Sequence, residues 1–115
     1  MSTVVIDSGG ANLASLRYAL QRLGAEVTVS LDPTVIRQAE RVLLPGVGAA
    51  GAAMQRLRSA GLVPVLRELE KPLLGICLGM QLLFEHSAED DTDTLGLMTG
   101  RVERLPASPE LPAPH

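Results

Sequence analysis

Apolar residues gather in short runs along the first 76 residues of the chain, and polar or turn-forming residues separate the runs. Runs at residues 3–7, 41–44 and 72–76 predict buried strands, because a strand covered on both faces shows no polar alternation. A further strand is predicted over residues 25–30, where two valines alternate with polar residues. The pattern therefore predicts a sheet of four short strands.

The segments between these strands carry apolar residues at the three- and four-residue spacing of a helix. The predicted helices cover residues 13–23, 49–60, 62–69 and 77 to about 86, and a short one begins at Pro33. Asn12 has the side chain of an N-cap for the first helix, and Gly24 follows its end. Because strands and helices alternate, we predict an α/β fold with a mostly parallel sheet and helices on both faces.

Three sharply turning segments follow predicted strands, after Asp7, after Leu44 and after Ile76. The carboxyl ends of parallel strands share one edge of a sheet, and ligands of such sheets bind there. We therefore expect a functional site at this edge. Later in the chain, the composition predicts an acidic loop over residues 89–93 and a peripheral hairpin over residues 95–105.

Composition narrows the classes of function. Ten Lys and Arg are outnumbered by thirteen Asp and Glu, and Tyr18 and Phe84 are the aromatic residues, so a nucleic-acid binder is disfavoured. The apolar runs are far shorter than the ~18 residues of a membrane helix. A single cysteine cannot form an internal disulfide, which fits the reducing cytoplasm, and we predict a cytoplasmic protein.

That cysteine lies in Gly75-Ile76-Cys77-Leu78-Gly79, a G-x-C-x-G pattern between a predicted strand and a predicted helix. The pattern parallels the G-x-S-x-G nucleophile elbow, whose glycines leave room for a sharp, strained turn. The sulfur would lie at a helix N-terminus, which favours the thiolate, and the N–H of Leu78 could face an oxyanion. We predict that Cys77 is a nucleophile; the alternative is a buried structural cysteine.

Neither histidine is a convincing base for this nucleophile. His86 lies nine residues after Cys77 on the predicted helix, about 13 Å along its axis and on another face. We therefore interpret His86 as a cation near a helix C-terminus. His115 ends a segment that holds half of the eight prolines, and the sequence does not determine its position.

A second pattern, Gly46 to Gly51, reads G-x-G-x-x-G and follows a predicted strand. This pattern is typical of dinucleotide sites, but here it follows the third strand instead of the first, and Glu68 and Glu70 precede the next strand at the wrong edge for a ribose. We predict that backbone N–H groups near Val47 and Gly48 complete an oxyanion hole beside the cysteine. The alternative is a glycine-rich turn with no ligand.

Together these residues resemble the class I glutamine amidotransferases. The matching segments are V-V-I-D-S-G-G-A-N-L-A-S-L-R-Y-A-L-Q-R-L-G from Val4, L-L-P-G-V-G-A-A-G-A-A-M from Leu43, and K-P-L-L-G-I-C-L-G-M-Q-L-L-F-E-H-S-A-E from Lys71. The resemblance is spread over residues 3 to about 105 and implies a flavodoxin-like fold. One departure is Ser8, where the family usually has an aromatic residue after Asp7.

The resemblance implies that Cys77 attacks the side-chain amide of glutamine and yields glutamate and ammonia through a γ-glutamyl thioester. By position, the implied oxyanion-hole residues are Gly46, Val47 and Leu78. The implied residues for the α-amino and α-carboxyl end of glutamine are Gly48, Gln81 and Glu89. No cofactor and no metal are implied. Gln81 could instead be a solvated helix residue, and Glu89 could simply belong to the acidic loop.

The resemblance also implies a heterodimer in which ammonia passes to a partner cyclase subunit. Asn12 matches a position facing that partner, although capping its helix would explain this residue equally well. Neither a nucleic acid nor a membrane is an expected partner.

Family members run to about 200 residues, close to the size of one such domain, and carry their catalytic His and Glu in the C-terminal part. We expect residues 1–105 to form an incomplete amidotransferase domain and residues 106–115 an irregular, proline-rich tail. His115 then does not match the catalytic histidine, and we expect little or no glutaminase activity from this chain alone. Two alternatives remain: a non-catalytic module that docks a cyclase, and a different cysteine hydrolase on the same elbow. Gln81 and the Leu-Pro-Gly-Val-Gly strand argue against the second.

Overall fold

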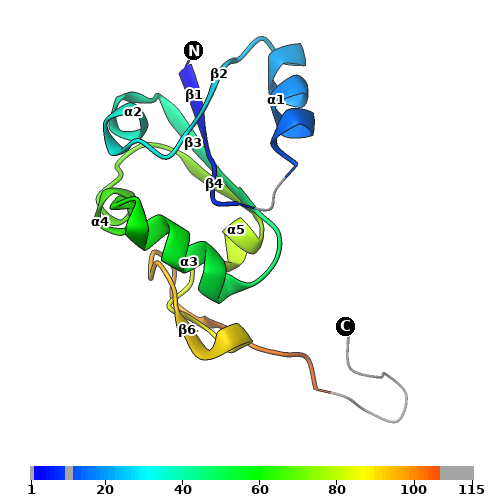
Figure 1. Ribbon diagram of the computed structural model, residues 1–115, viewed down its shortest axis with the longest axis vertical. Helices are drawn as coiled ribbons and strands as arrows, with labels where there is room; N and C mark the ends of the chain where they lie inside the picture. Colours follow the sequence, from blue (N-terminus) through cyan, green and yellow to red (C-terminus); the bar gives the residue numbers. More distant parts are fainter. Residues whose placement is uncertain (1, 10–11, 107–115) are drawn as a thin grey trace.

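A computed structural model describes residues 2–9 and 12–106, so the predictions for His115 and for most of the proline-rich tail lie outside the described residues. Four parallel strands form one sheet in the order β2-β1-β3-β4, which confirms the predicted mostly parallel α/β fold (Figure 1). The strands are β1 (Ser2–Ile6), β2 (Glu26–Ser30), β3 (Arg41–Gly46) and β4 (Leu73–Cys77). The order reverses between β1 and β3, where α/β sheets open a crevice for ligands.

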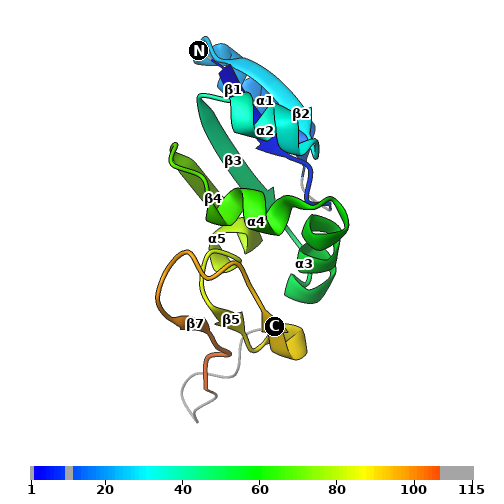
Figure 2. The ribbon, with the colours of Figure 1, turned by 90° about the vertical axis from the view of Figure 1, so that its left-hand side faces the viewer.

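Helices lie on both faces of this sheet, as predicted, but not equally. They are α1 (Leu13–Arg22), α2 (Pro33–Gln38), α3 (Ala50–Ser59), α4 (Leu62–Arg67) and α5 (Leu78–Gln81). The predicted N-cap is present, because Asn12 Oδ1 accepts from Ser15 N at 3.2 Å, and α2 is capped in the same way by Asp32 Oδ1, which accepts from Thr34 N at 2.8 Å. Helix α1 lies on one side of the sheet and α2, α3 and α4 on the other (Figures 1 and 2).

The hydrophobic core lies between the sheet and helices α2 to α4. Alternate residues of β1 and β3 point into it, because side chains of a strand alternate between its two faces. Its fully buried members from both layers include Ile6, Val42, Leu44, Ile36, Met54, Leu57, Leu62 and Leu66. This packing fixes the end of β3, and with it the glycine-rich segment that follows, against the start of α3.

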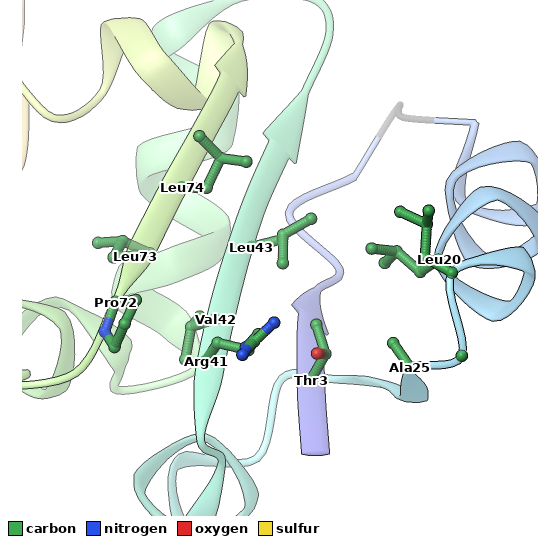
Figure 3. A pocket seen from close by; sticks show the side chains of 11 residues that line it. Thr3, Leu20, Ala25, Arg41, Val42, Leu43, Pro72, Leu73 and Leu74 are labelled. Atoms are coloured by element: carbon green, nitrogen blue, oxygen red, sulfur yellow. The ribbon is translucent and has the colours of Figure 1, made fainter. Parts of the chain in front are cut away.

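The opposite face of β3 and β4 stays open. Helix α1 buries none of its residues fully, and Leu23 at its end is 83% exposed. A cavity of about 580 Å³ lies on this face, between the end of α1 and strands β3 and β4, and Thr3 of β1 also lines it. Leu43 and Leu74 form part of its sheet wall (Figure 3). Leu74 is 58% exposed, so an apolar sheet face remains in contact with solvent.

The predicted helix from Cys77 to about His86 is wrong, because α5 ends at Gln81. The carbonyls that would continue the helix are taken by a distant segment: Leu82 O accepts from Leu95 N at 2.8 Å, and Phe84 O accepts from Gly96 N at 2.7 Å. These bonds compete with the i+4 amide bonds that would extend α5 as an α-helix.

The predicted hairpin over residues 95–105 is also wrong. A small sheet forms instead from β5 (His86–Ser87), β6 (Thr92–Asp93) and β7 (Arg101–Val102), in the order β6-β5-β7, with a 3₁₀ turn η1 (Glu89–Asp91) between β5 and β6. Strand β5 pairs antiparallel with β6 and parallel with β7. The backbone amides of residues 95–98 donate to carbonyls of residues 82–84, just after α5, and these residues do not pair as a strand. In the described ranges, no helix has the length and apolar character to cross a membrane.

Candidate active site

Cys77 ends β4 in a conformation that side chains rarely adopt. Its φ is 55° and its ψ is −121°, and its side chain is exposed. A non-glycine residue in this region stores strain of order 1–3 kcal/mol, and such residues cluster at functional sites. The strained turn expected from the G-x-C-x-G pattern is therefore present, and the alternative of a buried structural cysteine is excluded.

The two glycines of this pattern are required by close backbone approach. A Cβ on Gly79 would lie 1.7 Å from Leu44 O, and a Cβ on Gly75 would lie 2.7 Å from the Cα of Met80. Neither neighbour is the end of a flexible side chain, so neither can move aside. The turn from β4 into α5 consequently packs directly on the backbone of β3 and holds Cys77 at the carboxyl edge of the sheet.

The glycine-rich segment lies beside the cysteine, as the shared strand edge predicted. Gly46 ends β3 and pairs in register with Cys77. Val47 follows it and is 53% exposed, and Gly48 has a φ of +94° with open space around it. Leu78 opens α5, and the N–H of a first helical residue has no partner within the helix. Since α5 is a single turn, its dipole is weaker than that of the long helix expected from the sequence.

Ser8 is a feature that the sequence pattern did not single out. This residue is buried, and its Oγ donates to Pro45 O at 2.6 Å. The hydrogen bond ties the end of β1 to the end of β3, one residue before the start of the Gly46–Gly51 pattern. The sequence held one signal for it, because Ser8 is where the chain departs from the aromatic residue usual in the family.

The amides at the start of α3 are already bonded to carboxylates. Ala50 N donates to Glu89 Oε1 at 2.8 Å, and Gly51 N donates to Asp90 Oδ2 at 3.2 Å. A dinucleotide would need these N–H groups for its pyrophosphate, and two carboxylates would repel that anion. The dinucleotide interpretation of Gly46–Gly51 therefore has no support here.

Gln81 and Glu89 line the same cavity. The cavity measures about 610 Å³ and its walls are Gln81, Ala88, Glu89 and residues 102–105. Gln81 ends α5, four residues after Cys77, but neither Cys77 nor Gly48 is among the residues that line this cavity. Asn12 belongs to another part of the chain, at the start of α1, where it caps that helix.

His86 lies in β5 and is not the helix-terminal cation we expected, because α5 ends five residues earlier. Both ring nitrogens are engaged: Nδ1 lies 2.8 Å from Asp93 Oδ1, and Nε2 lies 3.0 Å from Asp91 Oδ1. A ring held in this way is not available as a base for Cys77, in agreement with the sequence argument. Among the described residues, no group of His, Cys, Asp and Glu is arranged as a metal site.

The contact with His86 lowers the pKa of Asp93 below its ordinary value of 3.8, first through the hydrogen bond and then through charge attraction. A carboxyl group with a lowered folded-state pKa stabilises the fold above its unfolded pKa, and this contribution is lost as the pH falls through the folded pKa. We therefore expect the thermal midpoint to fall as the pH drops from about 5 to about 2, and Asp93→Asn to reduce that fall.

Thermal unfolding followed by circular dichroism across this pH range measures the effect. Glu26→Gln, at an exposed position of β2, is the matched control and should leave the acid-side slope unchanged. An Asp93→Asn slope equal to that of the parent chain would contradict the prediction.

An elbow cysteine at the carboxyl edge of a parallel sheet, beside a glycine-rich strand end, defines a class of hydrolytic α/β domains. The chain belongs to the class-I glutamine amidotransferase family, whose model matches residues 4–108. Its curated relatives include the imidazole glycerol phosphate synthase subunit HisH of Xanthomonas oryzae pv. oryzae (strain MAFF 311018) and that of Xylella fastidiosa (strain Temecula1).

Each of these relatives is 57% identical over 111 residues, which is 96% of this chain and 56% of the relative. The chain thus spans little more than half the length of the curated relatives it matches. A solved glutamine amidotransferase superposes with a TM-score of 0.76 at 23% identity, over 89% of this chain and 56% of the other. A putative peptidase E from Listeria monocytogenes EGD-e superposes with a TM-score of 0.70 at 16% identity, over 84% of this chain and 62% of that chain. Both likenesses concern the fold alone.

Proposed function

We propose that this chain carries the nucleophile and the glutamine-binding surface of a glutaminase, which hydrolyses glutamine to glutamate and ammonia. The observation that carries the proposal is the exposed, strained Cys77, which pairs in register with Gly46 at the sheet edge. Membership of the class-I glutamine amidotransferase family supplies the substrate class.

In the proposed reaction the thiolate of Cys77 attacks the side-chain amide carbon of glutamine. The carbonyl oxygen becomes an oxyanion, which the N–H groups of Val47 and Leu78 stabilise together with the Gly46 segment. Collapse of this intermediate breaks its C–N bond, and the nitrogen takes up a proton from water and leaves as ammonia. A γ-glutamyl thioester remains on the sulfur, and a second water hydrolyses it to glutamate and frees the thiol. Preorganised backbone amides suit this step because they need no rearrangement when the charge develops.

The α-amino and α-carboxyl groups of glutamine are proposed to bind near Gly48, Gln81 and Glu89. Support comes from the cavity that Gln81 and Glu89 share, and from the position of Gln81 at the end of α5, the helix that follows Cys77. A carboxylate such as Glu89 attracts an ammonium group, and the amide of Gln81 can donate to a carboxylate.

Relatives that are 57% identical are named as the HisH subunit of imidazole glycerol phosphate synthase. We therefore propose that the ammonia is delivered to the cyclase subunit HisF in a heterodimer. It would there be built into imidazole glycerol phosphate, in cytoplasmic histidine biosynthesis. Asn12 is the proposed contact with this partner, in addition to its capping of α1.

A general base is still required for turnover. The histidine of the described part, His86, has both ring nitrogens bound to carboxylates. We thus assign a nucleophile and an oxyanion hole to the described residues, and assign them no base. We expect little or no ammonia release from the 115-residue chain by itself, as a coupled glutamate dehydrogenase assay would measure, and robust release would refute this expectation.

The test of the proposed function is covalent labelling by a chloromethyl ketone analogue of glutamine. Alkylation of Cys77, located by peptide mass spectrometry, should be slowed by free glutamine, and Gln81→Ala should slow it while leaving the rate with iodoacetamide unchanged. Labelling that glutamine does not slow would indicate a different cysteine hydrolase. Co-purification with the cyclase and no labelling would indicate a docking module.

A further inference from the structure

Helix α3 begins without a cap of its own. Its N-cap residue is Ala49, which makes no side-chain hydrogen bond to the first turn. The first amides of a helix have no partner within the helix and normally bond to a side chain at the N-cap. Here two carboxylates 39 residues away take that place, Glu89 on Ala50 N and Asp90 on Gly51 N.

The Asp90 side chain lies next to the position that a side chain at Gly51 would occupy. A Cβ on Gly51 would lie 3.0 Å from Asp90 Oδ2 and 3.2 Å from Asp90 Cβ. The absence of a side chain at Gly51 therefore allows the carboxylate to reach the amide. Asp90 is not among the residues that line the cavity shared by Gln81 and Glu89. It contacts the first turn of α3 instead, through the amide of Gly51.

The turn that presents these carboxylates is itself strained. Asp90 has a φ of 57° and Asp91 a φ of 45°, both in the left-handed region. Bonds from both sides hold it: Thr92 Oγ1 donates to Asp90 O at 3.1 Å, and the His86 ring contacts the Asp91 carboxylate. Strained backbone of this kind persists only where its surroundings determine it from several directions.

Three residues separate the two fixed points of the glycine-rich segment. Gly46 is held by its pairing with Cys77, and Ala50 is held by Glu89. The intervening Val47, Gly48 and Ala49 must span from one to the other, with Gly48 at a φ of +94°. The direction of the Val47 amide therefore depends on where α3 begins.

We propose that Asp90 is a positioning residue for the oxyanion hole, which acts by fixing the start of α3 and thereby the amides between Gly46 and Ala50. Its relevance to glutamine rests on the proposed glutaminase function, whereas the positioning itself can be tested without glutamine. Displacement of an oxyanion donor by a fraction of an ångström weakens stabilisation of the developing charge and slows acylation of Cys77.

Two small reagents separate this effect from the general reactivity of the thiol. With p-nitrophenyl acetate, Cys77 Sγ attacks the carbonyl carbon, an oxyanion forms, the C–O bond to p-nitrophenolate breaks and the acetyl group remains as a thioester. With iodoacetamide, the same sulfur displaces iodide from a saturated carbon and no oxyanion forms. The ratio of the two rate constants on the 115-residue chain, with the Cys77→Ala background subtracted, reports the oxyanion hole.

We expect Asp90→Ala to lower the acylation rate about tenfold or more and to leave alkylation within about twofold. Gly51→Ala should lower the acylation rate in the same direction by a smaller factor, because the added Cβ would lie 3.0 Å from Asp90 Oδ2 and push the carboxylate outward. Asp90→Asn should keep acylation within about threefold of the parent chain, since asparagine retains an acceptor oxygen and tolerates left-handed backbone. This rescue would not be seen if only the charge mattered.

Asp32→Ala is the matched control, because it removes the N-cap of α2, away from the cysteine. It should lower the thermal midpoint as a lost cap does, without changing the ratio. The proposal is overturned if Asp90→Ala leaves the ratio at the parent value, if acylation and alkylation fall together, or if Asp32→Ala lowers the ratio equally. Should one variant at the contact fail to fold, the other still decides.

The proposed function and the positioning role of Asp90 can fail independently. If Asp90→Ala lowers the ratio of acylation to alkylation rates but the glutamine analogue does not label the parent chain, the positioning role is supported and the glutamine substrate is refuted. Labelling that glutamine slows, with a ratio unchanged in Asp90→Ala, supports the substrate and overturns the positioning role.

Discussion

Replacing Gly79 by alanine is expected to abolish the native packing of the chain. The added Cβ would lie 1.7 Å from Leu44 O and 2.7 Å from Leu44 C, and both atoms belong to the backbone of β3. Relief of this overlap requires α5 to separate from the sheet, which would expose the fully buried Leu82 and its neighbours. Overpacking against a fixed backbone belongs to the severe class of mutations, so we expect a loss of about 4 kcal/mol or more in the free energy of unfolding.

Circular dichroism with thermal unfolding measures this loss directly. Gly24→Ala is the matched control: Gly24 has a φ of +83° but open space around it, so alanine there costs about 1 kcal/mol of backbone strain and no overlap. A Gly79→Ala chain that unfolds within a few degrees of the Gly24→Ala chain would show that α5 does not pack on β3 as described.

Replacing Cys77 by glycine should remove the thiol chemistry and stabilise the fold. At a φ of 55° a side chain costs strain that glycine does not incur. We expect Cys77→Gly to exceed Cys77→Ala by about 1 kcal/mol in the free energy of unfolding. Covalent labelling at position 77 should be lost completely in both variants, because the chain holds no other cysteine.

Urea unfolding of the two variants beside the parent chain checks the stability difference. Cys77→Ser keeps the size and the strain of the native residue and should unfold close to the parent. Equal stability of Cys77→Gly and Cys77→Ala would mean that the elbow relaxes when the sulfur is removed, and that the strain does not belong to the backbone.

The strands and most helices could be predicted from local patterns because local chemistry determines them. Asn12 and Asp32 cap the helices that they precede, and unbroken apolar runs indicate buried strands. The end of α5 could not be predicted in this way. Leucine-rich sequence after Gln81 favours a helix, but residues 94–98 compete for its carbonyls, and that competition is a tertiary effect.

The candidate site likewise has a part that local sequence predicts and a part that depends on distant contacts. Spacing alone located Cys77 between its two glycines and indicated that the Gly46 segment would share its edge of the sheet. The carboxylate contacts at the start of α3 span 39 residues, and nothing in the local sequence of Ala50 or Gly51 indicates them. Sequence pattern locates a candidate nucleophile on a turn, whereas the side chains that contact the neighbouring backbone come from distant parts of the chain.

The carboxylate of Glu89 belongs to two structures at once, the wall of a cavity and the first turn of a helix. Thermodynamic linkage makes such sharing reciprocal. An ammonium group that draws on this carboxylate weakens its hold on the Ala50 amide, and a helix that grips the carboxylate more tightly binds that ammonium group less well. Under the proposed function, we therefore expect occupancy of the cavity and anchoring of α3 to be coupled.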